Sequence, residues 1–305
     1  MKRFSLIALL LLALGARAQQ LEISNEIITS SEYKDSKDNH VGNGYMDKVS
    51  ATYSFPISMK LTEDKKPVMW RGVVRGFYGR MENSRSVAAY NPDDIFNATV
   101  NIMHIRPIGS RWMLMATAGV GIHTTFDNVT GRDIFVNAAA VFSYKHSDNL
   151  DYGVGVAAMT TYGWPLVLPM PYVRWHDGQN GGRPVPGTWA FDLNFMGRIQ
   201  AVASTWLTDR VKLNIDAFDM ESLHANIRQD GRWKVYNTTT MQSGVRPELV
   251  LGRNSSLSVA VGIVWRRTTC VADRSYSGFF KSFNHNRRRH FGRAAYLTVG
   301  YSTRL

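Results

Sequence analysis

Residues 48–60 read KVSATYSFPISMK, and this stretch decides the fold class. Apolar side chains occupy every second position of it, at Val49, Ala51, Tyr53, Phe55, Ile57 and Met59. Serine, threonine and lysine fill most of the positions between them. Successive side chains of a strand point to opposite faces, whereas those of a helix repeat about every 3.6 residues. The stretch therefore predicts a long β-strand with one apolar and one polar face.

The same alternation recurs along the chain, notably in residues 134–145, 211–217 and 257–266. Several of these runs exceed the five or six residues usual in soluble sheets, and a tilted strand that crosses a membrane needs about 9–11. We expect strands near residues 20–30, 46–61, 68–80, 95–108, 111–124, 133–147, 151–163, 211–220, 234–251, 256–268 and 294–305.

Alternation alone does not separate a soluble sandwich from a membrane barrel, because either one has an apolar and a polar face. Three further features favour the barrel. The connections alternate between tight turns, such as 109–110 and 148–149, and long polar loops at 31–45, 81–94 and 270–293. The chain ends inside a strand, which could close on the first strand and leave no free edge. Aromatic residues fall near strand ends, as in an interfacial girdle, at Trp70, Tyr78, Trp112, Tyr144, Tyr152, Trp175, Trp189, Trp206, Trp265 and Tyr301.

The sequence therefore predicts an all-β, antiparallel transmembrane β-barrel with short periplasmic turns and longer outer loops. The number of strands depends on residues 164–207, where prolines at 165, 169, 171, 184 and 186 interrupt the pattern. One strand there gives twelve in total and three give fourteen. We predict about twelve, within a range of roughly 10–14, since single-chain bacterial barrels usually have an even number.

The first eighteen residues have the form of a cleaved signal peptide, with a basic start, the apolar run Leu6–Leu14 and Ala16-Arg17-Ala18. Cleavage after Ala18 would leave residues 19–305 as one barrel domain. Lys2, Arg3 and Arg17 would leave with the signal, so the net charge would fall from +12 to +9. The chain has 305 residues, is 44% hydrophobic and holds one cysteine, which excludes a disordered chain and a disulfide scaffold.

These features together resemble uncharacterised, porin-like outer-membrane β-barrel families of Bacteroidetes. The Pro-rich middle, WPLVLPMPY at 164–172, and the closing AYLTVGY at 295–301 are part of the resemblance. It implies the outer membrane of a Gram-negative bacterium, export by the signal peptide, insertion by the barrel-assembly machinery, and no established activity. Such barrels usually end in an aromatic residue that this machinery reads. This chain ends in Thr303-Arg304-Leu305, and Tyr301 could serve instead.

No motif in the sequence carries catalytic or cofactor chemistry above background. The eight histidines lack metal-ligand spacing, so we expect no metal and no cofactor. His146-Ser147-Asp148-Asn149 invites a lipid-hydrolase interpretation, but adjacent strand residues point to opposite faces and Asp-Asn is typical of a tight turn. The sequence therefore leaves enzymatic activity open and favours a protein that is not an enzyme. We also expect no nucleic-acid binding, because exported chains of this kind rarely meet nucleic acid.

Positive charge is the one feature above background. Arg287, Arg288, Arg289 and Arg293 fall in the longest expected outer loop. They form either a solvated loop or a clamp for lipopolysaccharide phosphates, whose oxygens match guanidinium forks. Strand faces that would line the lumen carry further charges, at Arg71, Arg75, Lys212, Asp216, Arg246 and Glu248. Where positive charge dominates such a lumen, anions are favoured.

Three functions remain open on these observations. The first is a passive porin-like channel or small-solute transporter for an unknown solute, with outer-membrane lipid and lipopolysaccharide around it. The second is an outer-membrane lipid or lipid A hydrolase. The third is a structural or adhesive barrel whose loops bind partners.

Overall fold

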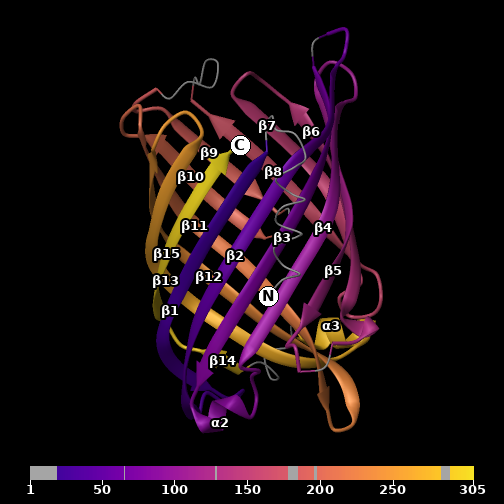
Figure 1. Ribbon diagram of the computed structural model, residues 1–305, viewed down its shortest axis with the longest axis vertical. Coiled ribbons are helices and arrows are strands. Elements are labelled where there is room, and N and C mark those ends of the chain that lie inside the picture. Colours follow the sequence, from indigo (N-terminus) through magenta and orange to yellow (C-terminus); the bar gives the residue numbers. More distant parts are fainter. Residues whose placement is uncertain (1–18, 65, 128, 178–184, 196–197, 283–288) are drawn as a thin grey trace, which may run out of the picture.

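Residues 48–60 lie in β2 (His40–Leu61), as their alternation predicts. The computed structural model describes residues 19–305 apart from 65, 128, 178–184, 196–197 and 283–288, and Figure 1 shows strands tilted around a tall barrel. The expected signal peptide lies outside the described residues. The strands are β1 (Gln20–Lys34), β2, β3 (Pro67–Asn83), β4 (Asp94–Pro107), β5 (Trp112–Thr124), β6 (Ile134–Lys145), β7 (Leu150–Met159), β8 (Leu166–His176), β9 (Trp189–Asn194), β10 (Ile199–Trp206), β11 (Val211–Gln229), β12 (Arg232–Val250), β13 (Ser255–Asp273), β14 (Arg289–Phe291) and β15 (Ala294–Arg304).

Each strand pairs antiparallel with its neighbour, and β15 pairs with β1 from Arg304↔Gln20 to Tyr296↔Ile28. Fourteen strands, β1–β13 and β15, therefore form a closed ring in the described part of the chain. The short β14 lies between β1 and β13 beyond the start of β15. Closure leaves no free edge, as the strand at the C-terminus predicts.

The predicted count of about twelve is two strands short, although fourteen lies within the predicted range. Residues 164–207 hold three strands, β8, β9 and β10, instead of one. Pro169 and Pro171 stand inside β8 and are exposed on its outer face. They are tolerated because β8 pairs with β9 only from Val173 to His176, so the proline positions face a paired neighbour on one side alone.

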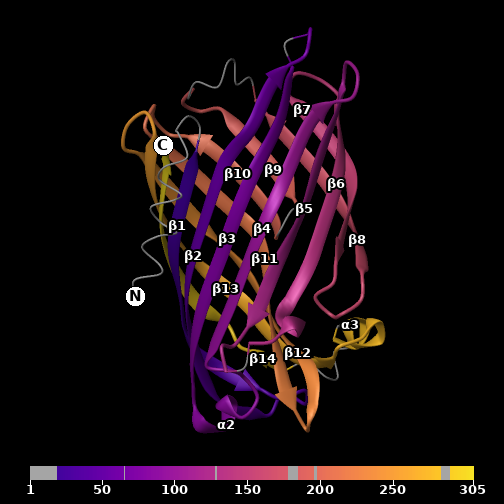
Figure 2. The same cartoon turned by 45° about the vertical axis from the view of Figure 1, so that its right-hand side comes forward.

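Most connections at one end of the barrel are tight turns, and the exception there is the longer connection of residues 177–188 between β8 and β9. Tight turns at 108–111, 146–149, 207–210 and 251–254 lie at the end where β15 finishes. The opposite rim carries α2 (Arg85–Ala88), α3 (Tyr276–Ser282) and the 3₁₀ turn η1 (Gly131–Asp133) (Figures 1 and 2). The prediction of a long loop at 31–45 is wrong, because β1 and β2 extend into this range and leave only a turn at 35–39. Likewise β11 runs nine residues past its expected end at 220, and a tight turn joins it to β12.

The outer face of the wall is apolar. Val100, Val154 and Val261, from three parts of the ring, are 55%, 64% and 46% exposed. So much exposed apolar surface around the whole ring is what contact with lipid requires. Trp112, Tyr144 and Tyr152 lie beside one another at the short-turn end, with ring centroids 5.0 and 5.7 Å apart, as an aromatic girdle predicts. Trp265 is an exception, since it lies midway along β13.

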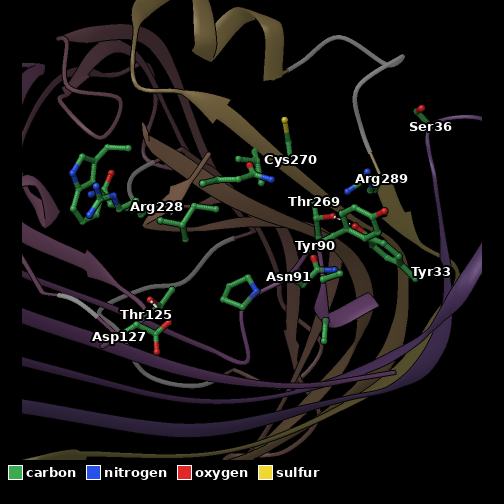
Figure 3. Close-up of a pocket in the computed structure, with 18 residues that line it drawn as sticks. Tyr33, Ser36, Tyr90, Asn91, Thr125, Asp127, Arg228, Thr269, Cys270 and Arg289 are labelled. Carbon is green, nitrogen blue, oxygen red and sulfur yellow. Dashed lines mark hydrogen bonds between the residues drawn. The ribbon is translucent and has the colours of Figure 1, made fainter. Parts of the chain in front are cut away.

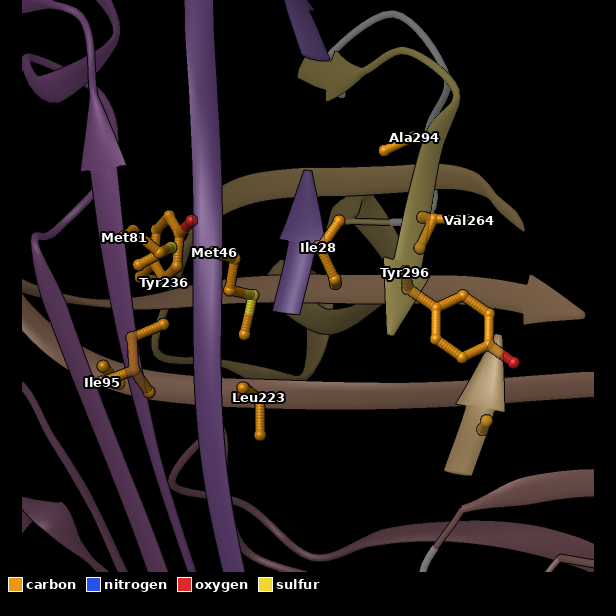
Figure 4. Packing of buried hydrophobic residues seen from close by; sticks show 11 residues of the cluster. Ile28, Met46, Met81, Ile95, Leu223, Tyr236, Val264, Ala294 and Tyr296 are labelled. Atoms are coloured by element: carbon orange, nitrogen blue, oxygen red, sulfur yellow. The ribbon is translucent and has the colours of Figure 1, made fainter. Parts of the chain in front are cut away.

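The barrel is flattened toward the rim that carries α2. β4 and β11 stand seven strands apart in the ring, yet Asn97 of β4 donates to the carbonyl of His224 at 2.7 Å and accepts from its amide at 3.1 Å. Buried apolar side chains fill this level between the two walls (Figure 4). This group, the apolar layer, consists of Ile28, Met46, Met81, Ile95, Leu223, Ala225, Tyr236, Ala260, Val264, Ala294 and Tyr296. The layer closes the lumen at this level.

Candidate functional site

A cluster of buried charges lies inside the barrel next to the apolar layer. Lys48 Nζ of β2 stands 2.8 Å from Glu26 Oε1 of β1 and 2.5 Å from Glu221 Oε2 of β11. Arg75 Nη2 of β3 is 3.5 Å from the other oxygen of Glu221. Because β11 is not a neighbour of β2 or β3 in the ring, these side chains meet across the lumen. We call Glu26, Lys48, Arg75 and Glu221 the lumen charge cluster.

Hydrogen bonds surround the lumen charge cluster on several sides. Glu26 also accepts from Gln242 Nε2 at 3.1 Å and from Thr298 Oγ1 at 3.2 Å. Side-chain exposure is 9% for Lys48, 7% for Glu26 and 10% for Glu221. Charges this deeply buried are stable only when they are paired and hydrogen-bonded, as they are here.

Two more ion pairs continue from the lumen charge cluster along β11. Arg198 Nη2 is 2.9 Å from Asp219 Oδ2. Arg246 of β12 holds Asp216 in a two-pronged pair, with N–O distances of 3.1 and 3.2 Å. Opposite charges thus line one wall of the lumen in matched pairs.

The residues predicted to line the lumen divide into two groups. Arg75, Asp216 and Arg246 belong to the ion pairs just described. Arg71 shares the strand face of Arg75, and its Nε is buried without a hydrogen-bond partner among the described residues. Lys212 stands opposite Glu248 in the register of β11 and β12 and lies 6.0 Å from the ring centroid of Trp206. Their effect on solute selectivity stays a prediction.

Sequence reasoning missed Glu26, Lys48, Glu221, Arg198 and Asp219. A shift of register between Asp216 and Asp219 explains part of this. Such a β-bulge inserts an extra residue, so Asp219 and Glu221 fall on the face of Asp216 although strict alternation separates them. The polar face of residues 48–60 did contain Lys48, but nothing local shows that it meets β11 across the lumen.

The rim that carries α2 opens into a cavity of about 670 Å³, which we call the vestibule. Its charged lining residues are Arg228, Arg289 and Asp127 (Figure 3). The Arg289 guanidinium lies 3.4 Å from the ring centroid of Tyr90. Tyr33 Oη and Thr269 Oγ1, both at the vestibule wall, share a hydrogen bond of 2.8 Å. The apolar layer, through Tyr236, lies directly beneath, since Tyr236 Oη donates to the lining residue Asn91 at 2.8 Å.

Of the four arginines predicted to contact lipopolysaccharide, the structure describes Arg289 and Arg293. Arg289 is half-buried at the vestibule, stacked on Tyr90, and does not extend from a loop tip. Arg293 is exposed between β14 and β15. Arg287 and Arg288 lie outside the described residues. Contact with lipopolysaccharide stays a prediction.

Two histidine sites bear on the hydrolase interpretation. His146 lies in the turn between β6 and β7, as the Asp-Asn pair predicts. His123 Nδ1 hydrogen-bonds to Asn97 Oδ1 at 3.0 Å, and Thr161 Oγ1 lies 3.5 Å from His123 Nε2. This has the order hydroxyl, imidazole, orienting amide of a nucleophilic triad. All three side chains are buried, and Asn97 is already committed to the bridge between β4 and β11. We therefore interpret Asn97, His123 and Thr161 as part of a structural polar core.

Among the described residues, no three histidine, cysteine or acidic side chains gather closely enough to hold a metal ion. In the same part of the chain, no helix is both long and apolar enough to span a membrane.

Three solved structures show overall similarity to the chain at about 10% sequence identity. An outer membrane channel of the COG4313 type from Pseudomonas putida F1 gives a TM-score of 0.48 at 10% identity, over 95% of this chain and 96% of the other. The P. putida toluene transporter TodX gives 0.40 at 9%, over 96% and 92%. The NanC porin gives 0.33 at 8%, over 93% and 100%.

A comparison with curated proteins finds no match. A family model described as "Domain of unknown function (DUF6268)" matches residues 14–304, nearly the whole chain. The chain therefore belongs to the DUF6268 family.

Proposed function

We propose that this protein is a porin-like channel for small solutes in the outer membrane of a Gram-negative bacterium. The observation that carries the proposal is a closed, lipid-compatible barrel whose interior holds charged and polar side chains at mid-height. In a purely structural barrel of this width, apolar side chains could fill the interior at a lower free-energy cost, because the burial of ions requires their desolvation.

In the part of the chain that the structure describes, the path through the barrel is constricted at the apolar layer. The vestibule leads down to the apolar layer, and the lumen charge cluster stands immediately behind it. The conformation described is closed, since Leu223 of β11 packs against Met46 and Ile95 of the facing strands. Conduction therefore requires the two walls to separate at this level.

Orientation follows from the two ends. The short turns and the ends of β1 and β15 would face the periplasm, and the rim with α2 and α3 would face outward. Export by a cleaved signal peptide and insertion by the barrel-assembly machinery are parts of the proposal. Lipopolysaccharide would then surround the outer half of the wall, within reach of Arg293.

The test is single-channel recording in planar bilayers with refolded protein. We expect the wild type to open rarely and the double variant Met46→Ala, Leu223→Ala to conduct more often, because it removes two side chains that join the walls. We also expect a reversal potential that favours anions, because arginines outnumber acids at the vestibule. The control is Met59→Ala, since Met59 is 64% exposed on the outer face.

A barrel that stays sealed at every voltage in both the wild type and the double variant would rule out the channel. Planar-bilayer conductance that rises equally in Met59→Ala would show that the change comes from general loosening of the wall.

A further inference from the structure

Among the described residues, Arg267 of β13 is the most deeply buried charge without an opposite charge. It is 1% exposed, and none of its three guanidinium nitrogens has a hydrogen-bond partner among the described residues. The undescribed segments contain no aspartate or glutamate, so the structure places all 24 acidic side chains of the chain. None of these forms an ion pair with Arg267.

Packing against an aromatic ring accounts for only one face of this guanidinium. Its carbon lies 3.6 Å from the ring centroid of Phe291. A cation over a ring is stabilised by the negative face of the π system. The N–H bonds, however, point outward in the plane of the guanidinium, where a ring beneath it accepts none of them. A buried donor set of this kind needs an acceptor.

A second arginine lies beside Arg267 on the same face of the wall. In the register of β13 and β14, Phe291 stands opposite Arg267 and Arg289 stands opposite Thr269. Arg267 and Arg289 are therefore diagonal neighbours, and the backbones of such positions typically stand about 7–8 Å apart. Two positively charged side chains at neighbouring positions of one face repel each other, and an anion between them would offset this repulsion.

The vestibule reaches Arg289, the outer member of this pair. Thr269 and Arg289 line it (Figure 3). Arg267 stands two residues before Thr269 on the same face of β13, behind that lining. The hydrogen bond between Tyr33 and Thr269 holds the wall at this point. The one acidic lining residue, Asp127, accepts a hydrogen bond from Thr125, at the side away from Arg289 in Figure 3.

We propose that the floor of the vestibule is a binding site for an oxyanion, held between the guanidinium groups of Arg267 and Arg289. A carboxylate or a phosphate group fits, because a guanidinium donates two parallel N–H bonds to either. The inference deepens the proposed function by naming the chemical class of its solute, but binding does not require conduction.

The experiment is isothermal titration calorimetry of the full chain in detergent, with inorganic phosphate and acetate as probes at constant ionic strength. We expect saturable binding of at least one probe, and a loss of about tenfold or more in affinity in Arg267→Met and in Arg289→Gln. The matched control is Arg80→Gln, which removes the same charge from a side chain that is 64% exposed, and it should bind as the wild type does.

A heat signal that choline chloride reproduces, or equal affinities in wild type and both variants, would overturn the proposal. If Arg267→Met does not fold, Arg267→Lys replaces it, because lysine keeps the charge and loses the planar fork. That variant should bind more weakly, and unchanged binding in it and in Arg289→Gln would again overturn the site.

Purified lipopolysaccharide, added as a competitor, identifies the source of the anion. Competition would assign the site to a lipid phosphate, and its absence would assign it to a soluble solute. A barrel that binds phosphate but never conducts would refute the channel and leave the anion site intact, whereas one that conducts without binding would do the reverse.

Discussion

At the scale of single residues, Lys48 determines the charge balance inside the lumen. One ammonium group neutralises two buried carboxylates, Glu26 and Glu221, from strands on different walls. Removing it would leave Glu26 without a cationic partner and Glu221 with only the longer contact to Arg75. A buried ion that loses its partner destabilises a protein more than an exposed one, because water does not replace the lost interaction.

We therefore predict that Lys48→Met lowers the free energy of unfolding by about 3–5 kcal/mol, measured by urea titration in detergent. The double variant Glu26→Gln, Lys48→Met should recover most of this loss, because Glu221 still pairs with Arg75 and no unpaired charge remains. The control is Lys145→Met. Its partner Asp148 lies in an exposed turn, where the hydrogen bond from Lys145 lowers the pKa of the Asp148 carboxyl. Water screens that pair, so stability should stay nearly unchanged. Equal losses in the two single variants would contradict the assignment.

At the scale of elements, glycines in the strands leave room for aromatic rings of neighbouring strands. Tyr296 of β15 lies over Gly244 of β12 and Gly262 of β13, where an added Cβ would collide with its ring. Phe135 of β6 covers Gly121 of β5 in the same way and stacks on His123 at 3.8 Å. Rings that cover glycines in this way fix the register of neighbouring strands.

The matched pair Gly244→Ala and Gly76→Ala tests this. Gly244→Ala should lower the free energy of unfolding by about 1–3 kcal/mol, because Tyr296 and the carbonyl of Val261 stand where the methyl group would lie. Gly76 lies in β3 with nothing within 4 Å of an added Cβ, so Gly76→Ala should be neutral or slightly stabilising. Urea unfolding of both variants measures the two changes. A loss of unfolding free energy in Gly76→Ala as large as that in Gly244→Ala would contradict this explanation.

At the scale of the whole molecule, stability depends on ring closure between β1 and β15. Every strand has two neighbours only if this seam forms, and the open edges would otherwise expose unpaired backbone groups to lipid. The seam joins the two ends of the described chain, so it forms only once the whole ring is in place.

We predict that the wild type migrates faster on a gel when it is not boiled, as closed barrels that resist detergent do. Deletion of residues 294–305 should abolish the difference, because β1 and β13 lose their partner. Deletion of Leu305 alone, which follows the last paired residue, should preserve it. Heat-modifiable migration in the chain without β15 would show that the ring closes by another route.

The sequence by itself determined the class of this protein. Period two in stretches such as 48–60 depends only on neighbouring residues and on which face meets lipid, so it predicted the barrel, the tight turns and the seam. Arg75, Asp216 and Arg246 were found because they lie on polar faces of regular strands.

The tertiary structure alone decided the rest. Contacts across the lumen, such as Lys48 with Glu221, join residues with no local relation, and the bulge before Asp219 reverses the alternation that would have located them. The strand count depended on a partner for β8 that covers only its last four residues, Val173–His176, which makes its prolines acceptable. Flattening of the ring brings β4 against β11, closes the lumen and buries Arg267. Packing between distant walls is determined by the whole ring and not by any one strand.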